Sequence, residues 1–235
     1  MGQKCCSSEE PPENDLIRFA HTRLLEKETW SNEAKKKVQG GTDSNRLIGG
    51  ALMNYTAEMF RQSFFPQPQQ RDDWKNIVRD EKPNLIFEDD SGFQLYIGAA
   101  KHATNIPLLE MLDIGRILNV SDTGGSADFY GDCYQYDNII MEDREDFNIS
   151  KHFNQTSAVI SAAKQRKESI LVHCTAGVSR SVTVVIAYLM RFEGLSLENA
   201  AAKVRSHRLQ AFPNTGFVHQ LLLFELESNL ARTTI

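Results

Sequence analysis

The feature that most constrains this chain is the stretch 169–192, where an apolar run, a short loop and a second apolar run follow one another. Ile170-Leu171-Val172 predicts a strand that ends at His173-Cys174, and Val182–Met190 predicts a buried helix. A loop between a strand and a helix N-terminus points backbone N–H groups and the positive end of the helix dipole at one place, which favours an anion. A thiol at the start of this loop and the Arg180 guanidinium at its end indicate a site that attacks a phosphate group.

The composition excludes several classes of protein. Hydrophobic residues make up 41% of the chain and charged residues 24%, which is typical of a soluble globular protein. The net charge of -5 argues against a broad nucleic-acid-binding surface, so no nucleic acid partner is expected. No apolar run approaches the ~20 residues that cross a bilayer. The polar N-terminal residues predict no secretory signal peptide.

The four cysteines, Cys5, Cys6, Cys133 and Cys174, are too few for a disulfide framework at this length and indicate a reducing, cytoplasmic location. None has a histidine at the spacing of zinc ligands. His173 and Cys174 are neighbours on a predicted strand, so their side chains should point to opposite faces. No metal site is therefore predicted.

The N-terminus, M-G-Q-K-C-C-S, is similar to an N-myristoylation signal in which Gly2 is acylated after removal of the initiator methionine. The match is imperfect, because Cys6 stands where serine or threonine is usual. Cys5 and Cys6 could accept palmitate, and a second lipid makes membrane attachment stable. The prediction is a cytoplasmic protein that these three residues can anchor to a membrane surface. The alternative is a polar N-terminus in which Gly2 is accidental.

The chain divides into a helical N-terminal segment, 1–71, and a main domain, 72–235. Helical spacing is present in Asn14–Trp30 and Ile48–Phe65, and Pro66–Gln70 follows as a break. In the main domain, strand and helix patterns alternate. The predicted strands are Leu95–Ile97, Ile117–Val120, Tyr134–Ile140 and Ile170–Val172; further predicted helices are Asn105–Leu112, Ser150–Lys167 capped by Ser150, one capped by Ser196, and a last one over Phe217–Leu226. This alternation predicts an α/β fold with a central, mostly parallel sheet flanked by helices.

The chemistry expected of Cys174 depends on its thiolate. A helix N-terminus and a nest of N–H groups favour the thiolate, so the pKa of Cys174 should lie below that of a free thiol. The loop would then hold a phosphate in line with the sulfur, and Arg180 could bind it with two parallel hydrogen bonds. The predicted phosphate-binding residues are Thr175, Ala176, Gly177, Val178, Ser179 and Arg180.

The segment 173–181, H-C-T-A-G-V-S-R-S, contains the pattern H-C-x-x-x-x-x-R, and T-V-V-I-A-Y-L-M follows it. R-I-L-N-V lies upstream, and P-N-x-G-F-x-x-Q-L lies downstream. Together these motifs resemble the dual-specificity branch of the cysteine-based protein tyrosine phosphatases, over Leu95–Leu226. The alternative, a structural cysteine in an ordinary α/β turn, does not account for a match of this extent.

The resemblance implies a protein-tyrosine-phosphatase-like fold and a two-step hydrolysis that needs no metal or organic cofactor. Cys174 would be the nucleophile that becomes a phosphocysteine, and Arg180 would bind the phosphoryl oxygens. His173 would hydrogen-bond the local backbone and help to set the thiolate pKa. Ser181 would donate a hydrogen bond to the departing thiolate in the second step.

The leaving group needs a proton from a nearby acid. Composition alone leaves Asp137, Glu142, Asp143, Glu145 and Asp146 as candidates. In the family that this chain resembles, the acid lies five residues before the asparagine of an Asn-apolar-Ser stretch. Asn-Ile-Ser at 148–150 fits that pattern and selects Asp143, with Asp146 as the alternative.

Two further residues leave alternatives open. Arg208 matches a basic position that, in some relatives, reaches a second phosphate of the substrate; the alternative is an exposed arginine at a helix end. Cys133 could form a disulfide with an oxidised Cys174, but a plain buried thiol is favoured.

Three functions remain to be compared. The first is a phosphatase for phosphotyrosine and phosphoserine or phosphothreonine, whose partners are phosphorylated proteins and can include kinases of a signalling cascade. The second is a phosphatase for a phosphoinositide or an RNA 5′-phosphate, and the third is a phosphate-binding scaffold without activity. Thr175, Ala176 and Val178 are uncharged, which disfavours a highly anionic substrate. The presence of Cys174, Arg180 and Asp143 together disfavours the scaffold.

Overall fold

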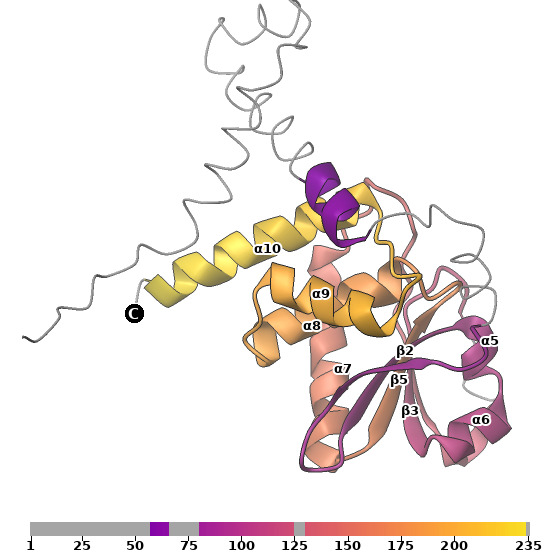
Figure 1. Cartoon of the computed structure of the whole chain (residues 1–235). Helices are drawn as coiled ribbons and strands as arrows, with labels where there is room; N and C mark the ends of the chain where they lie inside the picture. Colours follow the sequence, from indigo (N-terminus) through magenta and orange to yellow (C-terminus); the bar gives the residue numbers. More distant parts are fainter. Residues whose placement is uncertain (1–56, 66–79, 125–129, 234–235) are drawn as a thin grey trace, which may run out of the picture. The chain divides into compact units, whose positions relative to one another are not determined.

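The computed structural model describes residues 57–65, 80–124 and 130–233 of the chain (Figure 1). These residues all belong to one compact unit, Ala57–Ile235. Gly2, Cys5 and Cys6 lie outside the described residues, as do the predicted helix Asn14–Trp30 and the predicted domain boundary between residues 71 and 72. Of the predicted helix Ile48–Phe65, the part that the structure describes is helical over residues 57–64.

A five-stranded sheet forms the centre of the described unit, in the order β1-β2-β5-β3-β4. Its strands are β1 (Asn84–Glu88), β2 (Gln94–Ala99), β3 (Ile114–Asn119), β4 (Gln135–Asn138) and β5 (Ser169–Cys174). Only the pairing of β1 with β2 is antiparallel. The prediction of a mostly parallel sheet is therefore confirmed. All six residues of β5 are buried, as expected for the middle strand of a sheet covered on both faces.

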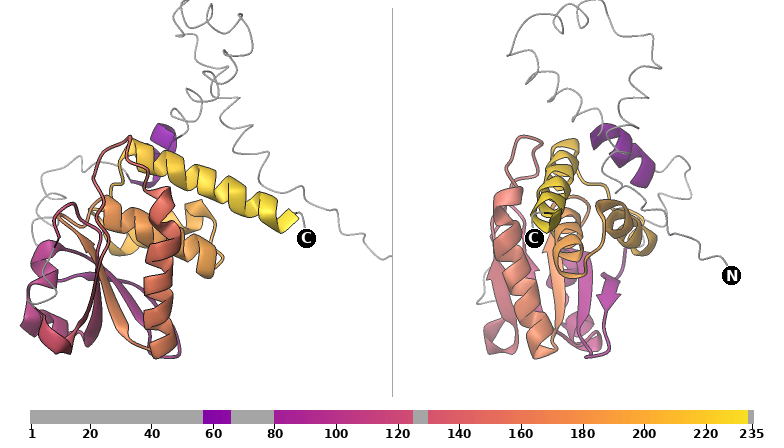
Figure 2. Two further views of the ribbon diagram at one scale, coloured as in Figure 1. Left: turned by 180° about the vertical axis from the view of Figure 1, so that it is seen from behind. Right: turned by 90° about the vertical axis from the view of Figure 1, so that its left-hand side faces the viewer.

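Helices cover both faces of this sheet (Figures 1 and 2). The short helices α5 (Ala100–Ala103) and α6 (Ile106–Met111) pack against β2, β3 and β5 from one side. On the other side, α7 (Phe153–Arg166) and α8 (Arg180–Phe192) lie against β5, and α9 (Leu197–His207) lies against β1. The last helix, α10 (Thr215–Thr233), packs on α8. The described residues also include the 3-10 turns Gly131–Cys133 and Ser150–His152.

Apolar burial explains why the segment after Cys174 is a core helix. Every residue of α8 from Arg180 to Met190 is buried. Each fully buried Val, Leu or Ile contributes roughly 1.5–3 kcal/mol relative to an exposed one. On the opposite face, Leu109 of α6 packs with Ile117 and Leu171 of the sheet. Apolar contacts along the helix therefore fix the position of its first residue, Arg180.

One predicted helix cap is confirmed and another is wrong. The Ser196 hydroxyl accepts the Asn199 N–H at 3.2 Å and caps α9. Ser150 caps no helix, because it lies inside a 3-10 turn and donates its hydroxyl to Asn148 at 2.9 Å. The Asn148 side chain accepts the Lys151 N–H at 3.3 Å, so Asn148 rather than Ser150 gives a backbone N–H of this turn its hydrogen-bond partner. Asparagine and serine are equally good caps, so composition could not separate them.

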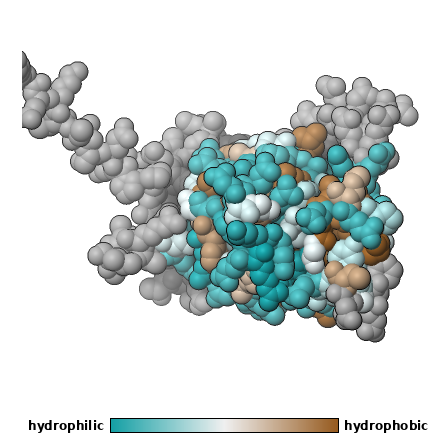
Figure 3. Space-filling view, turned by 90° about the horizontal axis from the view of Figure 1, so that it is seen from below, coloured by the Kyte–Doolittle hydropathy of each residue, from teal (hydrophilic) through white to brown (hydrophobic). Residues whose placement is uncertain are grey.

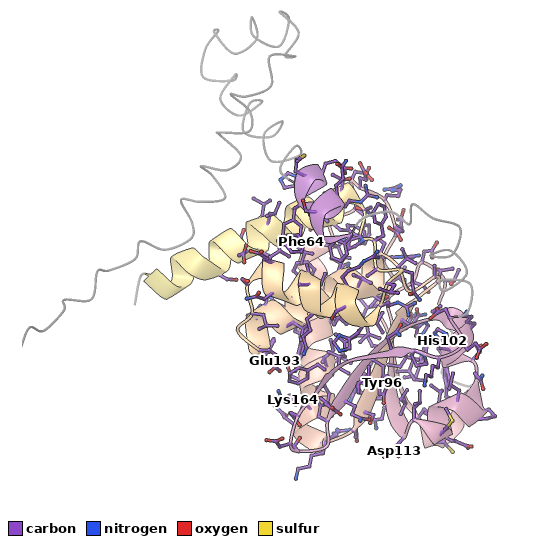
Figure 4. All side chains as sticks on the ribbon, in the orientation of Figure 1. Phe64, Tyr96, His102, Asp113, Lys164 and Glu193 are labelled. Carbon is purple, nitrogen blue, oxygen red and sulfur yellow. The ribbon has the colours of Figure 1, made fainter. Side chains whose placement is uncertain are left out.

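Charged residues pair with one another on the outside of the described unit. Lys164 on α7 donates to Glu193 at 2.7 Å, and both side chains are labelled in Figure 4. The face seen from below is largely hydrophilic, with apolar residues in small separate groups (Figure 3). Among the described helices, none is both long and apolar enough to cross a membrane.

Candidate active site

The loop 175–179 joins the end of β5 to the start of α8, at the carboxyl end of the central strand. Gly177 has a φ of +68°, in the left-handed region that glycine adopts without strain. A Cβ at this position would collide with the carbonyl oxygen of Gly98 on β2 and with the Arg208 guanidinium. Behind the loop, the Phe212 N–H donates to the Val178 carbonyl at 2.8 Å. The loop is therefore held against the end of the sheet on two sides.

The Cys174 sulfur lies inside this loop, and the residue is 1% exposed. The Gly177 N–H donates to Sγ at 3.2 Å, and the Ser181 hydroxyl lies 3.4 Å from it. Burial by itself raises the pKa of the thiol, but the hydroxyl and N–H of Ser181, the charge of Arg180 and the Val178 N–H outweigh it, so the pKa lies below its ordinary value. This direction agrees with the sequence prediction.

His173 is buried next to the cysteine, with its Nδ1 3.4 Å from the Cys174 carbonyl oxygen. This is the local backbone contact that the sequence predicts. Burial is the main reason that the pKa of His173 falls from 6.5 to about 4, and the contact with the Cys174 carbonyl opposes this shift. The imidazole is therefore neutral at pH 7.

Arg180 is the first residue of α8 and is 5% exposed. One of its terminal nitrogens, Nη1, donates to the Met141 carbonyl at 3.0 Å and to Asp122 at 2.8 Å. The other, Nη2, donates to the Thr175 hydroxyl at 3.1 Å. The buried Nε has no hydrogen-bond partner, although Asp143 Oδ2 lies 3.4 Å away. A buried donor of this kind is a ready partner for an anion oxygen.

Asp143 lies on the segment between β4 and the 3-10 turn Ser150–His152. Its Oδ1 accepts the Ser179 hydroxyl at 2.7 Å and the Asn214 side-chain amide at 2.9 Å. With the Arg180 Nε nearby, this carboxylate contacts both the phosphate-binding loop and the start of α10.

The other candidate acids are placed differently. Asp137 forms an ion pair with Arg116 at 2.8 Å on neighbouring strands. Glu142 and Asp146 both pair with the exposed Arg144, at 3.3 and 3.2 Å. Glu145 is exposed. Of the five carboxylates, Asp143 is the one that contacts the loop, through Ser179 and Arg180.

Asp122 belongs to the site although the sequence reasoning missed it. Its carboxylate accepts Arg180 Nη1 and lies 3.4 Å from the Thr175 hydroxyl. The hydrogen bond from Arg180 is the main reason that the pKa of Asp122 lies below its ordinary value. The available signal was position: Asp122 follows β3, a parallel neighbour of β5, and such strands bring their carboxyl ends to one edge of the sheet.

The predicted role of Arg208 disagrees with its position. This side chain is fully buried, so it is neither at a surface that a second phosphate could reach nor an exposed helix end. Its Nε donates to the Gly177 carbonyl at 2.6 Å, and Nη2 lies 3.4 Å from the Ala176 carbonyl. The far side of the guanidinium pairs with Asp80 at 3.2 Å and donates to Asn84 at 2.6 Å. Arg208 therefore supports the loop from behind.

Cys133 lies in the 3-10 turn before β4 and is an exposed free thiol. The expectation of a buried thiol at this position is wrong, because the turn sits on the surface. Its alternative role as a partner for an oxidised Cys174 stays a prediction.

The sheet order and the loop after its central strand define the protein-tyrosine-phosphatase-like class of α/β folds. The structure is similar to that of human DUSP28, with a TM-score of 0.56 and 29% identity over 63% of this chain and 95% of that one. It is also similar to the human tyrosine phosphatase-like serine/threonine/tyrosine-interacting protein, with a TM-score of 0.55 and 30% identity over 63% of this chain and 97% of that one.

At the level of sequence, the profile of the dual specificity phosphatase catalytic domain matches residues 95–227. The chain is 40% identical to human dual specificity protein phosphatase 7 over 131 residues, which are 56% of this chain and 31% of the relative. It is 37% identical to dual specificity protein phosphatase 1 of Arabidopsis thaliana over 142 residues, which are 60% of this chain and 68% of the relative. The chain therefore belongs to the dual specificity phosphatase family, and it spans less than a third of the length of the human relative.

Proposed function

We propose that this protein hydrolyses phosphotyrosine and phosphoserine or phosphothreonine on proteins through a phosphocysteine intermediate. The observation that carries the proposal is the environment of Cys174. Its sulfur is held where the thiolate is favoured, and the buried Nε of Arg180, without a hydrogen-bond partner, lies at the other end of the same loop. Membership of the family supports the same activity.

In the first step, the Cys174 thiolate attacks phosphorus and the bond between phosphorus and the leaving oxygen breaks. Arg180 and the backbone N–H groups of 175–179 bind the phosphoryl oxygens, whose negative charge must be stabilised in the transition state. Asp143 gives its proton to the leaving oxygen, which departs as a neutral alcohol or phenol. The contacts of Asp143 with Ser179 and Asn214 support this role, because they hold the carboxyl group beside the loop.

In the second step, water attacks phosphorus, Asp143 takes a proton from that water, and the bond between phosphorus and sulfur breaks. The products are inorganic phosphate and the regenerated thiolate. Ser181 donates a hydrogen bond to the departing sulfur, a role supported by its 3.4 Å distance from Sγ. His173 is a positioning residue that is neutral and contacts the Cys174 carbonyl.

A protein is the favoured substrate over a phosphoinositide or an RNA end. The carboxylates of Asp122, which is half exposed, and Asp143 lie at the phosphate-binding loop. A polyanionic substrate would bring further negative charge close to both, which is unfavourable. The uncharged side chains of Thr175, Ala176 and Val178 offer no compensating cation.

A scaffold without activity is the second candidate, because one similar structure is that of a tyrosine phosphatase-like interacting protein. The contacts around Cys174 argue against it here. A protein that only binds phosphate needs no thiol whose pKa is lowered by a serine and an arginine.

The test compares wild type with Cys174→Ser and Asp143→Ala. Wild type should hydrolyse 4-nitrophenyl phosphate, phosphotyrosine peptides and phosphothreonine peptides, and Cys174→Ser should lose essentially all turnover while still retaining phosphopeptide. Asp143→Ala should lose about 10²–10⁴-fold with phenyl phosphate, which needs a proton on its leaving group, and much less with 4-nitrophenyl phosphate. Turnover by Cys174→Ser would reject the nucleophile. If Asp146→Ala showed this dependence on the leaving group instead, Asp143 would be rejected as the general acid. A preference for a phosphoinositide or RNA substrate would reject a protein as the substrate class.

We also propose that Gly2, Cys5 and Cys6 are acylated and attach this otherwise cytoplasmic protein to a membrane surface. The support is the sequence alone, since one acyl chain binds membranes marginally and two bind stably.

A further inference from the structure

The helix at residues 57–64 lies before the segment that matches the family profile, yet it contacts the edge of the active site. Arg61 Nε donates to the Pro213 carbonyl at 2.8 Å, and the guanidinium carbon lies 3.6 Å from the centre of the Phe212 ring. The Thr215 hydroxyl donates to the Glu58 carboxylate at 2.7 Å. One face of this helix therefore holds the segment 212–215 at both ends.

That segment is part of the support of the catalytic groups. Between its two anchored ends, the Asn214 side-chain amide donates to Asp143 at 2.9 Å. The Asn214 N–H donates to the Ser179 hydroxyl at 3.3 Å, and this hydroxyl in turn donates to Asp143 at 2.7 Å. Any shift of 212–215 would thus move two of the hydrogen bonds that place the general acid.

The segment that carries Asp143 also rests on the first turns of α10. A Cβ on Gly216 would collide with the carbonyl oxygen of Glu145, so the two backbones touch. Gln220 donates to the Phe147 carbonyl at 2.9 Å and accepts the Ser150 N–H at 3.0 Å. The start of α10 therefore supports the segment that carries Asp143. Thr215, the first residue of α10, is also the residue that donates to Glu58.

Buried apolar residues anchor the helix 57–64, and Glu58 provides its charged acceptor. Ala57 and Phe65 are fully buried and Phe60 is 8% exposed, while Phe64, labelled in Figure 4, stacks on Phe60. Burial alone would raise the pKa of Glu58, but the hydrogen bond from Thr215, with Gln62 and Arg61, holds it below its ordinary value. Glu58 is thus a carboxylate at neutral pH, the better acceptor for Thr215.

We infer that the helix 57–64 is a positioning element of the active site, in which Arg61 and Glu58 fix Asn214 and, through it, the carboxyl group of Asp143. The inference rests on the proposed function, because it assigns the placement of that reaction's general acid to a part of the chain outside the family profile. Arg61 and Glu58 touch no reacting atom and act only through Pro213, Thr215 and Asn214.

The test measures kcat/KM, which reports on the steps up to release of the leaving group, for phenyl phosphate and 4-nitrophenyl phosphate. Arg61→Ala in the full chain should lose about 10-fold with phenyl phosphate and less than about 3-fold with 4-nitrophenyl phosphate, because a displaced acid matters most where the leaving group needs its proton. Glu58→Gln, which keeps the shape and removes the charge, should show the same pattern at a smaller size. Ser63→Ala is the matched control, since Ser63 is exposed and its hydroxyl donates to the Met59 carbonyl of its own helix.

The combined variant Arg61→Ala/Asp143→Ala separates positioning from general damage. If Arg61 acts through the acid, it should be no slower than Asp143→Ala alone; a further loss of 10-fold would contradict the inference. Equal losses for both substrates in Arg61→Ala, or no loss in Arg61→Ala and Glu58→Gln, would also overturn it. A wild-type protein that hydrolyses neither substrate would instead reject the proposed function, so the two failures are distinguishable.

Discussion

Replacing Arg208 with methionine should weaken the fold much more than an ordinary surface substitution. Arg208 is fully buried, and the Asp80 side chain with which it pairs at 3.2 Å is 10% exposed, so solvent screens this pair little. Removing one partner of a buried pair costs about 3–5 kcal/mol. Asp80 keeps Lys101 at 3.9 Å and His102 at 3.7 Å as neighbours, which places the expected loss near the lower end, at about 3 kcal/mol.

The assay is urea unfolding of the full chain, with thermal unfolding beside it. A loss of about 3 kcal/mol should lower Tm by roughly 6–12 °C for a domain of this size. Arg166→Met is the matched control, because its side chain is 54% exposed and its ion pair with Glu168 is 4.0 Å long, so less than about 1 kcal/mol is expected. A loss below about 1 kcal/mol in Arg208→Met would refute the reasoning from burial.

A second measurement separates loop support from substrate contact. Arg208 donates to the carbonyls of Gly177 and Ala176, which belong to the phosphate-binding loop itself. Arg208→Met should therefore lower kcat/KM by the same factor for singly and doubly phosphorylated peptides. A loss confined to the doubly phosphorylated peptide would restore the sequence-based interpretation, in which Arg208 binds a second phosphate.

Two further predictions concern the pH dependence of stability and the N-terminus. Folding lowers the pKa of His173 from 6.5 to about 4, so below pH 6.5 the unfolded chain binds a proton that the folded chain rejects. The free energy of unfolding should fall by up to about 3 kcal/mol between pH 6.5 and 4, and His173→Asn should flatten this slope; urea unfolding at a series of pH values measures both, and an unchanged slope would contradict the assignment. Gly2→Ala should move the protein from the membrane to the soluble fraction of cells, and an unchanged distribution would reject acylation.

The central part of the fold was predictable because its signals are local in sequence. The apolar strand before Cys174, the loop with Gly177 and the apolar helix after Arg180 are consecutive, so hydrophobic pattern alone defines them. The structure confirms β5 and α8 at these places and the mostly parallel sheet around them.

The strand β1 was missed because it is short and lies at the edge of the sheet. Its residues Asn84–Glu88 contain three apolar side chains in a row without the alternation of a half-buried strand. Its pairing with β2 also shifts register between Leu85 and Phe87, which breaks the regular pattern.

The residues that support the site from outside the loop were not predictable, because their contacts join distant parts of the chain. Arg208 meets Asp80 across 128 residues, and Arg61 meets Pro213 across 152. Charged residues such as these are usually on the surface, so their types argue against burial unless their partners are known. The motif around Arg208 therefore suggested a contact with substrate, while the Asp80 carboxylate with which it pairs lies 128 residues earlier in the chain.

These contacts also bear on where the catalytic unit begins. The family profile starts at residue 95, but β1, Asp80 and the helix 57–64 all lie before it. Without Asp80, the guanidinium of Arg208 would be a buried charge without its carboxylate, directly behind Gly177. Without the helix, Asn214 would lose the two anchors on either side of it. The limits of the family profile therefore do not define the unit that folds, because the loop that carries Cys174 depends on residues that the profile leaves out.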